Sequence, residues 1–176
     1  RYSYTPQGDV AQIRYADGRE VTLSYNPLRH LQEIRDWLGI TRIDTDPAGR
    51  AKRVVYRDGK EASYTYGAMG ERRSITYPDG KEVKYDYDEH LRLTELKDGN
   101  RVISYEYDEY GSLYRKQFPN GITTLYTYDQ KKQLKELVHQ DVDGILDSYR
   151  YDYDAFGNKT LTEKNRRGLE EESGVY

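Results

Sequence analysis

The chain has 176 residues, of which 35% are hydrophobic, 34% are charged, 20 are Tyr and none is Cys. Its 28 basic and 31 acidic residues leave a net charge of −3, which excludes the basic surface of a nucleic-acid-binding protein, and the absence of Cys excludes disulfides and thiolate metal sites. The low net charge and the buriable tyrosine rings argue against a disordered chain, the modest aliphatic content argues against a compact enzyme core, and no apolar run is long enough to form a membrane span.

A strand pattern ending in Tyr recurs about every 20–21 residues from the N-terminus onward. Thr45 takes the place of the marker Tyr once, and the last interval is longer, which predicts an insertion near residues 139–146. The marker tyrosines are Tyr4, Tyr25, Tyr66, Tyr87, Tyr107, Tyr128 and Tyr153.

A glycine in the middle of each repeat keeps the same period and usually follows Asp or Asn. Asp-Gly and Asn-Gly tolerate positive φ and are the strongest short signal for a β-hairpin. These glycines are Gly18, Gly39, Gly59, Gly80, Gly99, Gly121 and Gly144.

A second turn follows each marker Tyr after four residues. Most repeats have Gly at this position, but three have Arg29, Leu91 and Lys132. An Asp directly after the marker Tyr recurs as well, and we expect it to cap this turn through its side chain rather than to act in catalysis.

Residues between the turns alternate in polarity, as in Val83, Tyr85 and Tyr87 against Lys84 and Asp86. This period of two is typical of strands. The sequence therefore predicts an all-β fold of about 16 short antiparallel strands, formed by about eight repeats. So wide a sheet does not stay flat, and we expect a continuous, strongly curved meander that is part of a spiralling open shell or barrel.

The phased Tyr-x-Tyr-Asp and Asp-Gly motifs resemble the YD repeat of Rhs proteins, which also occurs in the C component of insecticidal toxin complexes and in teneurins. The resemblance covers nearly the whole chain. It implies a β-sheet that spirals into a hollow shell, which encloses a toxic C-terminal domain in bacterial members and forms an adhesion scaffold in teneurins. The motif at which toxin-bearing members cleave themselves is absent from this sequence.

This resemblance implies two segments: a repeat sheet over residues 1–164, and a charged loop with the start of another repeat over residues 165–176. The expected function is a non-catalytic wall segment of a shell, with the rest of that shell and its enclosed cargo as partners, in a secreted or surface-exposed bacterial protein. The terminal strands would be exposed edges, so edge-to-edge self-association of the chain is a further expectation.

The alternative function is adhesion or carbohydrate binding through exposed tyrosines outside the marker positions, above all Tyr110 and Tyr114. The repeated tyrosines themselves are expected to pack across strands. No catalytic residue, cofactor or metal site is expected, because the carboxylates recur as turn residues and His30, His90 and His139 share no ligand spacing.

Overall fold

The computed structural model describes residues 1–169 and 172–175, and this part of the chain is all-β. Each described strand pairs antiparallel with the strand that follows it, which confirms the expected meander. The described residues form 17 strands rather than about 16, the additional one being β17 (Glu172–Val175). No helix in residues 1–169 and 172–175 has the length and apolar character of a membrane span.

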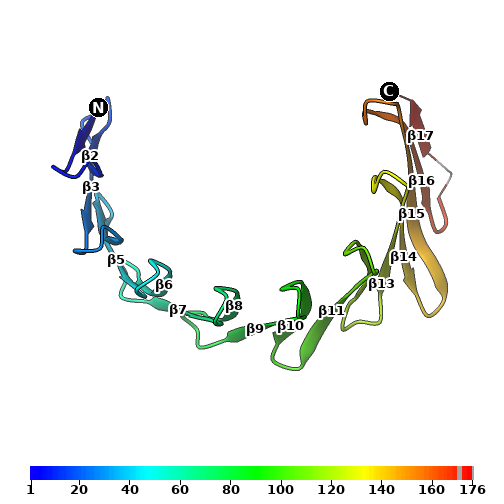
Figure 1. The fold of residues 1–176 in the computed structure, drawn as a ribbon, viewed down its shortest axis with the longest axis horizontal. Coiled ribbons are helices and arrows are strands. Elements are labelled where there is room, and N and C mark those ends of the chain that lie inside the picture. The colour runs from blue at the N-terminus through cyan, green and yellow to red at the C-terminus, as the bar shows by residue number, and fades with distance from the viewer. Residues whose placement is uncertain (170–171, 176) are drawn as a thin grey trace. The chain divides into compact units, whose positions relative to one another are not determined.

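The first of two compact units is Arg1–Lys84. Its strands follow one another in chain order (Figure 1), and β9 crosses the boundary to the second unit. The strands are β1 (Tyr2–Tyr4), β2 (Val10–Arg14), β3 (Glu20–Tyr25), β4 (Leu31–Asp36), β5 (Gly39–Thr45), β6 (Ala51–Val55), β7 (Glu61–Tyr66), β8 (Arg72–Thr76) and β9 (Glu82–Tyr87).

The second unit is Tyr85–Tyr176. Its longest strand is β15 with 10 residues, and the segment 139–146, where the sequence has its longer interval, comprises the end of β14, the turn and the start of β15. Its strands after β9 are β10 (Leu93–Asp98), β11 (Arg101–Tyr107), β12 (Leu113–Gln117), β13 (Thr123–Tyr128), β14 (Leu134–Asp141), β15 (Gly144–Tyr153), β16 (Lys159–Arg166) and β17.

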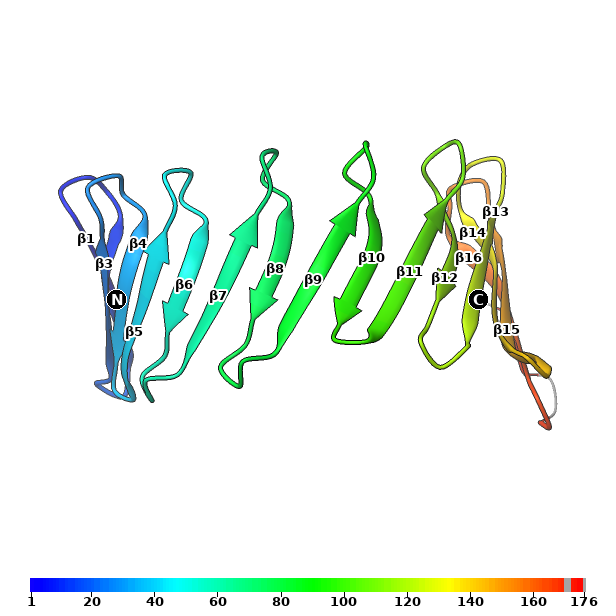
Figure 2. The ribbon, with the colours of Figure 1, turned by 90° about the horizontal axis from the view of Figure 1, so that it is seen from below.

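Two kinds of turn alternate along the meander and gather at opposite ends of the strands (Figure 2). At the Asp-Gly end, Gly80 has φ +82° and donates its N–H to the Tyr77 carbonyl at 2.9 Å. At the other end, Asp88 Oδ1 accepts the amides of His90 and Arg92, each at 2.9 Å. The same pattern at Asp46, Asp108, Asp129 and Asp154 confirms that the Asp after the marker position caps the turn.

A β-bulge follows each marker position for which the register is defined. Ser24 pairs with Glu33 and Tyr25 with Leu31, so one extra residue lies on the second strand. Bulges interrupt the ladder and increase its local twist. The bulge therefore bends the chain at the same place in every repeat and leaves a carbonyl there for another donor.

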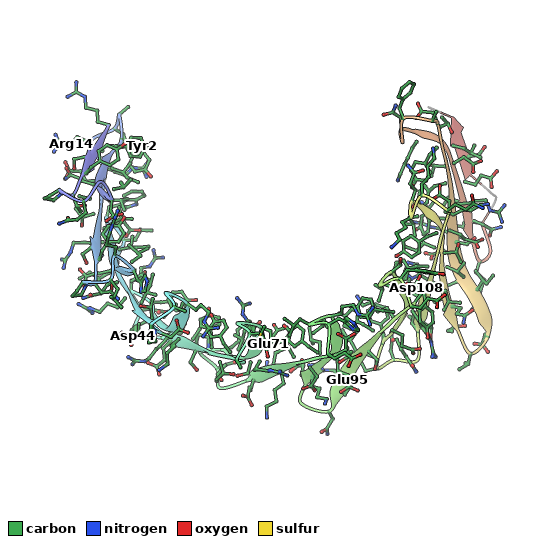
Figure 3. The ribbon with its side chains drawn as sticks, viewed as in Figure 1. Tyr2, Arg14, Asp44, Glu71, Glu95 and Asp108 are labelled. Carbon is green, nitrogen blue, oxygen red and sulfur yellow. The ribbon has the colours of Figure 1, made fainter. Side chains whose placement is uncertain are left out.

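The two faces of each unit differ in composition, and side chains project from both (Figure 3). Register places Val54, Ala62 and Tyr64 on one face and ion pairs such as Arg53–Glu61 on the other. Among the described residues only Ala62, Ser74, Thr123 and Thr124 are fully buried. A single layer of strands buries its apolar face mainly under wide tyrosine rings, which explains the low aliphatic content.

Candidate functional site

The marker tyrosines form a repeated contact between successive repeats. The Tyr107 hydroxyl donates to the Leu93 carbonyl at 2.9 Å, and Leu93 begins β10. A buried carbonyl needs such a donor because its desolvation is otherwise uncompensated. The same bond joins Tyr25 to Val10, Tyr66 to Ala51, Tyr128 to Leu113 and Tyr153 to Leu134, at 2.8–2.9 Å.

Not every marker position makes this bond. Thr45 has no ring, and its hydroxyl lies 3.4 Å from the Asn26 amide instead. Tyr4, on the first strand, is 61% exposed. The sequence predicted that these tyrosines hold repeats together by packing, whereas the structure adds a hydroxyl-to-carbonyl bond that residue spacing alone did not reveal.

The residue five positions after the marker reaches forward onto the next repeat. The Arg92 guanidinium lies 4.8 Å from the Tyr107 ring centroid, and Arg50 lies 4.7 Å from that of Tyr66. Cations stacked on aromatic faces in this way stabilise by about 0.5–1 kcal/mol at exposed sites. Each such tyrosine is therefore held both through its hydroxyl and through its ring.

The same forward-reaching side chain covers the turn glycine of the next repeat. A Cβ atom on Gly49 would lie 2.9 Å from the His30 ring, closer than Cβ atoms normally approach. Arg50 over Gly70 and Gln133 over Gly157 repeat this arrangement at 3.1 Å. Glycine is required here by positive φ and also by a neighbour from the preceding repeat.

At two of the three turns that lack the glycine, the preceding repeat offers a smaller side chain, whereas Leu91 follows Glu71, a residue as large as Gln133. Asp9 forms a two-pronged ion pair with Arg29, with Oδ1 at 2.8 Å and Oδ2 at 2.9 Å. Ser112 precedes Lys132 by the same spacing. Arg29 and Lys132 keep positive φ, 65° and 62°. With the exception of Glu71, where one turn carries a large side chain, as at His30, the next turn has glycine. Where it carries a small one, as at Asp9, the next turn has a long side chain at the glycine position.

The two tyrosines proposed for ligand contact line a common groove in the second unit. Tyr110 is 71% exposed and Tyr114 is 40% exposed. Together with Tyr126, Asp108 and Asp129 they border a volume of about 460 Å³. The Tyr114 hydroxyl donates to Glu106 at 2.6 Å. The meander predicted from the sequence places β13 beside β12, but which side chains border the groove depends on strand register.

A Thr–His–Asp row, which the sequence did not single out, crosses β13, β14 and β15. Thr124 Oγ1 lies 2.8 Å from His139 Nδ1, and His139 Nε2 lies 3.8 Å from Asp147 Oδ1. Although these are the residue types of a nucleophile, a base and an orienting acid, Thr124 is only 1% exposed. A substrate cannot reach that hydroxyl, so we interpret the row as cross-strand packing beneath the long β14–β15 hairpin.

The other titratable residues serve the turns and the charged face. Asp86 binds Lys97 at 2.7 Å, whereas Asp88 caps its turn. His90 is exposed in a turn, and His30 packs on Gly49. In the part of the chain that the structure describes, no three His, Asp or Glu side chains gather as a metal site.

Comparison with known proteins connects these repeats to one family of sequences and structures. Residues 46–82 match the family described as RHS Repeat. The crystal structure of TcdB2-TccC3-Cdc42 shares 17% identity at a TM-score of 0.79, over 98% of this chain and 12% of that one. A Photorhabdus luminescens Tc holotoxin pore shares 18% identity at 0.64, over 91% and 11%. No curated protein sequence matches.

The crystal structure of TcdB2-TccC3 is similar too, with 16% identity and a TM-score of 0.66, over 94% of this chain. The chain spans only about 11–12% of the length of these matched structures. At such identities the likeness shows the fold, while the family match adds the repeat sequence itself. Residues 46–82 thus carry a segment like the RHS repeat, the same phased motifs recur along the chain, and the chain shares the fold of these Tc toxin structures.

Proposed function

We propose that this chain is a non-catalytic wall segment of a shell that encloses a toxin or other cargo. The observation that carries the proposal is the repeated Tyr–carbonyl bond, which assigns the most regular residues of the chain to joining one repeat to the next. The fold likeness to Tc toxin structures supports it. A secreted or surface-exposed bacterial protein is the setting in which such a wall would act.

The proposal is tested on the complete gene product that contains this chain. Electron microscopy should show a hollow particle with density inside it, and the enclosed segment should resist added protease. Replacing Tyr128 with Phe removes one inter-repeat bond and should make the enclosed segment more sensitive, whereas Tyr110→Phe is the matched control outside the marker positions. A solid particle, or a segment cleaved equally fast in all forms, would contradict a shell.

A second candidate function is carbohydrate binding in the groove of Tyr110, Tyr114 and Tyr126. The observation that favours it is the pair of carboxylates there: the Oδ1 atoms of Asp108 and Asp129 cap turns, while their Oδ2 atoms have no partner among the described residues. Tyrosine rings and free carboxylate oxygens are suited to stack on and hydrogen-bond a sugar. Saturable binding on a glycan array that Tyr110→Ala and Tyr114→Ala both abolish would support this function.

Self-association through β1 remains a prediction for the isolated chain. Arg1 and Arg14 exchange both backbone hydrogen bonds, so the alternation of an antiparallel pair turns the amides of Tyr2 and Tyr4 outward. The side chains of Glu170, Glu171 and Glu172, expected to protect the other edge, lie outside the described residues. Sedimentation should show a dimer that Ser3→Lys weakens, and a monomer at high concentration would argue against it.

A further inference from the structure

A row of exposed aromatic side chains lies at the Asp-Gly end of the first unit. Tyr15 is 45% exposed, Trp37 48%, Tyr56 40% and Tyr77 44%. They occupy corresponding places beside successive Asp-Gly or Leu-Gly turns. None of them makes the Tyr–carbonyl bond of the marker positions, but the Arg19 guanidinium stacks on the Trp37 ring, 4.4 Å from its centroid.

These rings stand on one face of the unit. Ile13 pairs with Val21, Val54 with Ala62 and Ile75 with Val83 on the apolar face. Because side chains two residues apart point the same way in a strand, Tyr15, Tyr56 and Tyr77 continue that face. Trp37 joins it through an edge-to-face contact with Tyr15, at 5.9 Å between ring centroids.

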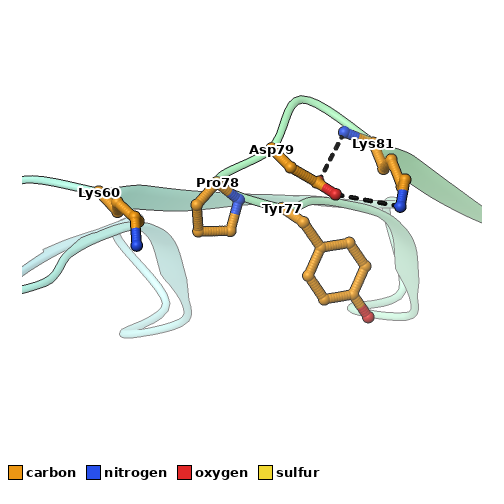
Figure 4. Close-up of a pocket in the computed structure, with 5 residues that line it drawn as sticks. All are labelled: Lys60, Tyr77, Pro78, Asp79 and Lys81. Atoms are coloured by element: carbon orange, nitrogen blue, oxygen red, sulfur yellow. Dashed lines mark hydrogen bonds and ion pairs between the residues drawn. The ribbon is translucent and has the colours of Figure 1, made fainter.

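The turns between these rings form two adjoining hollows. One, of about 360 Å³, is bordered by Thr41, Tyr56 and Arg57, and the other, of about 560 Å³, by Tyr77, Asp79 and Lys81. Lys60 and Pro78 border both hollows, and Figure 4 shows Pro78 between Lys60 and Tyr77. The hollows therefore form one shallow groove that runs across the strands from repeat to repeat.

The charges of this groove nearly cancel. Lys60 pairs with Asp58 at 3.1 Å and Lys81 pairs with Asp79 at 3.2 Å. Arg57 packs its aliphatic stem against Gly39, and its guanidinium has no ion-pair partner in the described part of the chain. The groove thus presents tyrosine rings and a single unpaired positive charge. Such a surface complements a partner that is neutral except for one acidic residue. It attracts a polyanion only weakly.

The spacing of the groove specifies the shape of that partner. Corresponding residues of successive repeats are two strands apart, about 9.6 Å. A polyproline II helix repeats every three residues, or about 9.3 Å, and aromatic-lined grooves bind it without a large loss of chain entropy. We propose that the groove from Tyr56 to Tyr77 binds a proline-rich segment in this conformation, with prolines of a Pro-x-x-Pro motif in successive hollows and an acidic residue against Arg57.

The test uses the full chain and a fluorescein-labelled proline-rich peptide of about nine residues with one Glu. Anisotropy should show saturable binding, and the emission of Trp37, the only Trp in the chain, should shift on addition of unlabelled peptide. Tyr77→Ala should weaken binding about tenfold, whereas Phe156→Ala, which removes a 91% exposed ring in the second unit, should leave it unchanged. A peptide with Gly in place of each Pro should bind about tenfold more weakly than the proline-rich one.

A charge exchange guards against a variant that merely misfolds. Arg57→Glu should lose affinity for the Glu peptide and gain affinity for the same peptide carrying Lys instead. The proposal is overturned if the proline-rich and Gly peptides bind equally, if the charge exchange does not reverse the preference, or if a neutral or sulfated oligosaccharide binds this groove and the peptide does not.

Discussion

Two successive junctions in the first unit join their turns with opposite choices of residue. At the junction of turns 5–9 and 26–30, the short carboxylate of Asp9 binds the long side chain of Arg29. At the next junction, the wide ring of His30 lies over Gly49. The backbone is the same at both, since Arg29 and Gly49 have φ of 65° and 82°.

The difference shows that the two turn positions are chosen together. The space between neighbouring turns is fixed by the strand pairing, so a large side chain from one repeat requires a small one from the next. Arg29 accepts a strained backbone of about 1–2 kcal/mol in exchange for its ion pair and stem packing. The residue at the turn-glycine position of these two repeats therefore follows the size of its neighbour in the preceding repeat.

The largest single effect should come from filling Gly49. Gly49→Ala and Gly8→Ala both place Cβ at positive φ, but only Gly49 has a ring at 2.9 Å, while nothing lies within 4 Å of Gly8. We expect about 1 kcal/mol of destabilisation at Gly8 and about 2–3 kcal/mol at Gly49. Urea denaturation of both variants measures the difference, and equal losses would show that His30 imposes no constraint.

A smaller effect should follow from removing one marker hydroxyl. Tyr107→Phe leaves the ring under Arg92 but deprives the Leu93 carbonyl of its donor. The expected loss is about 1 kcal/mol. Tyr77→Phe, in which the lost hydroxyl has no hydrogen-bond partner among the described residues, should change stability little. If the two variants unfold at the same denaturant concentration, the hydroxyl bond does not stabilise the junction.

Stability should also fall at alkaline pH. Burial raises the pKa of Tyr105 and of Tyr126 above the value in an unfolded chain. Folding therefore favours the neutral phenol. The contribution of these phenols to the free energy of unfolding is complete below about pH 10 and is lost as pH rises through the pKa of the folded state. Denaturation midpoints measured across this range should decline less steeply in Tyr126→Phe than in the parent or in Tyr77→Phe, and identical profiles would contradict this origin.

The smallest effect should come from the first junction's ion pair. Hydrogen bonding to Arg29 lowers the pKa of Asp9, but the arginine is more than half exposed. Exposed pairs of this kind contribute little to stability, because solvent and salt screen their attraction. Asp9→Asn should therefore lower the midpoint slightly at low salt and not measurably at high salt. A loss that persists in high salt would show that packing rather than charge holds the pair.

The repeat period and the all-β meander could be predicted because each repeat carries its own local signals. Asp-Gly specifies a turn through backbone conformation, and Asp88 caps its turn within four residues. Alternation identifies the strands because side chains of a strand point to opposite faces. These signals need no knowledge of the neighbouring repeat, so they can be found in the sequence alone.

The contacts between repeats could not be predicted in the same way. The acceptor of the Tyr107 hydroxyl lies 14 residues earlier, on the neighbouring strand β10. The ring over Gly49 comes from His30, in the preceding turn. Likewise, Tyr110 and Tyr114 border one groove only because β13 brings Tyr126 beside them. Each of these features follows from pairing rather than from local sequence.

The most direct test of matched turns is to rebuild the first junction at the second. His30→Asp and Gly49→Arg are made singly and together, and the free energy of unfolding is measured for all four proteins. We expect Gly49→Arg to be strongly destabilising alone, and His30→Asp added to it to restore at least about 1 kcal/mol, which is a favourable coupling between the two positions. Losses that simply add, within about 0.5 kcal/mol, would contradict it.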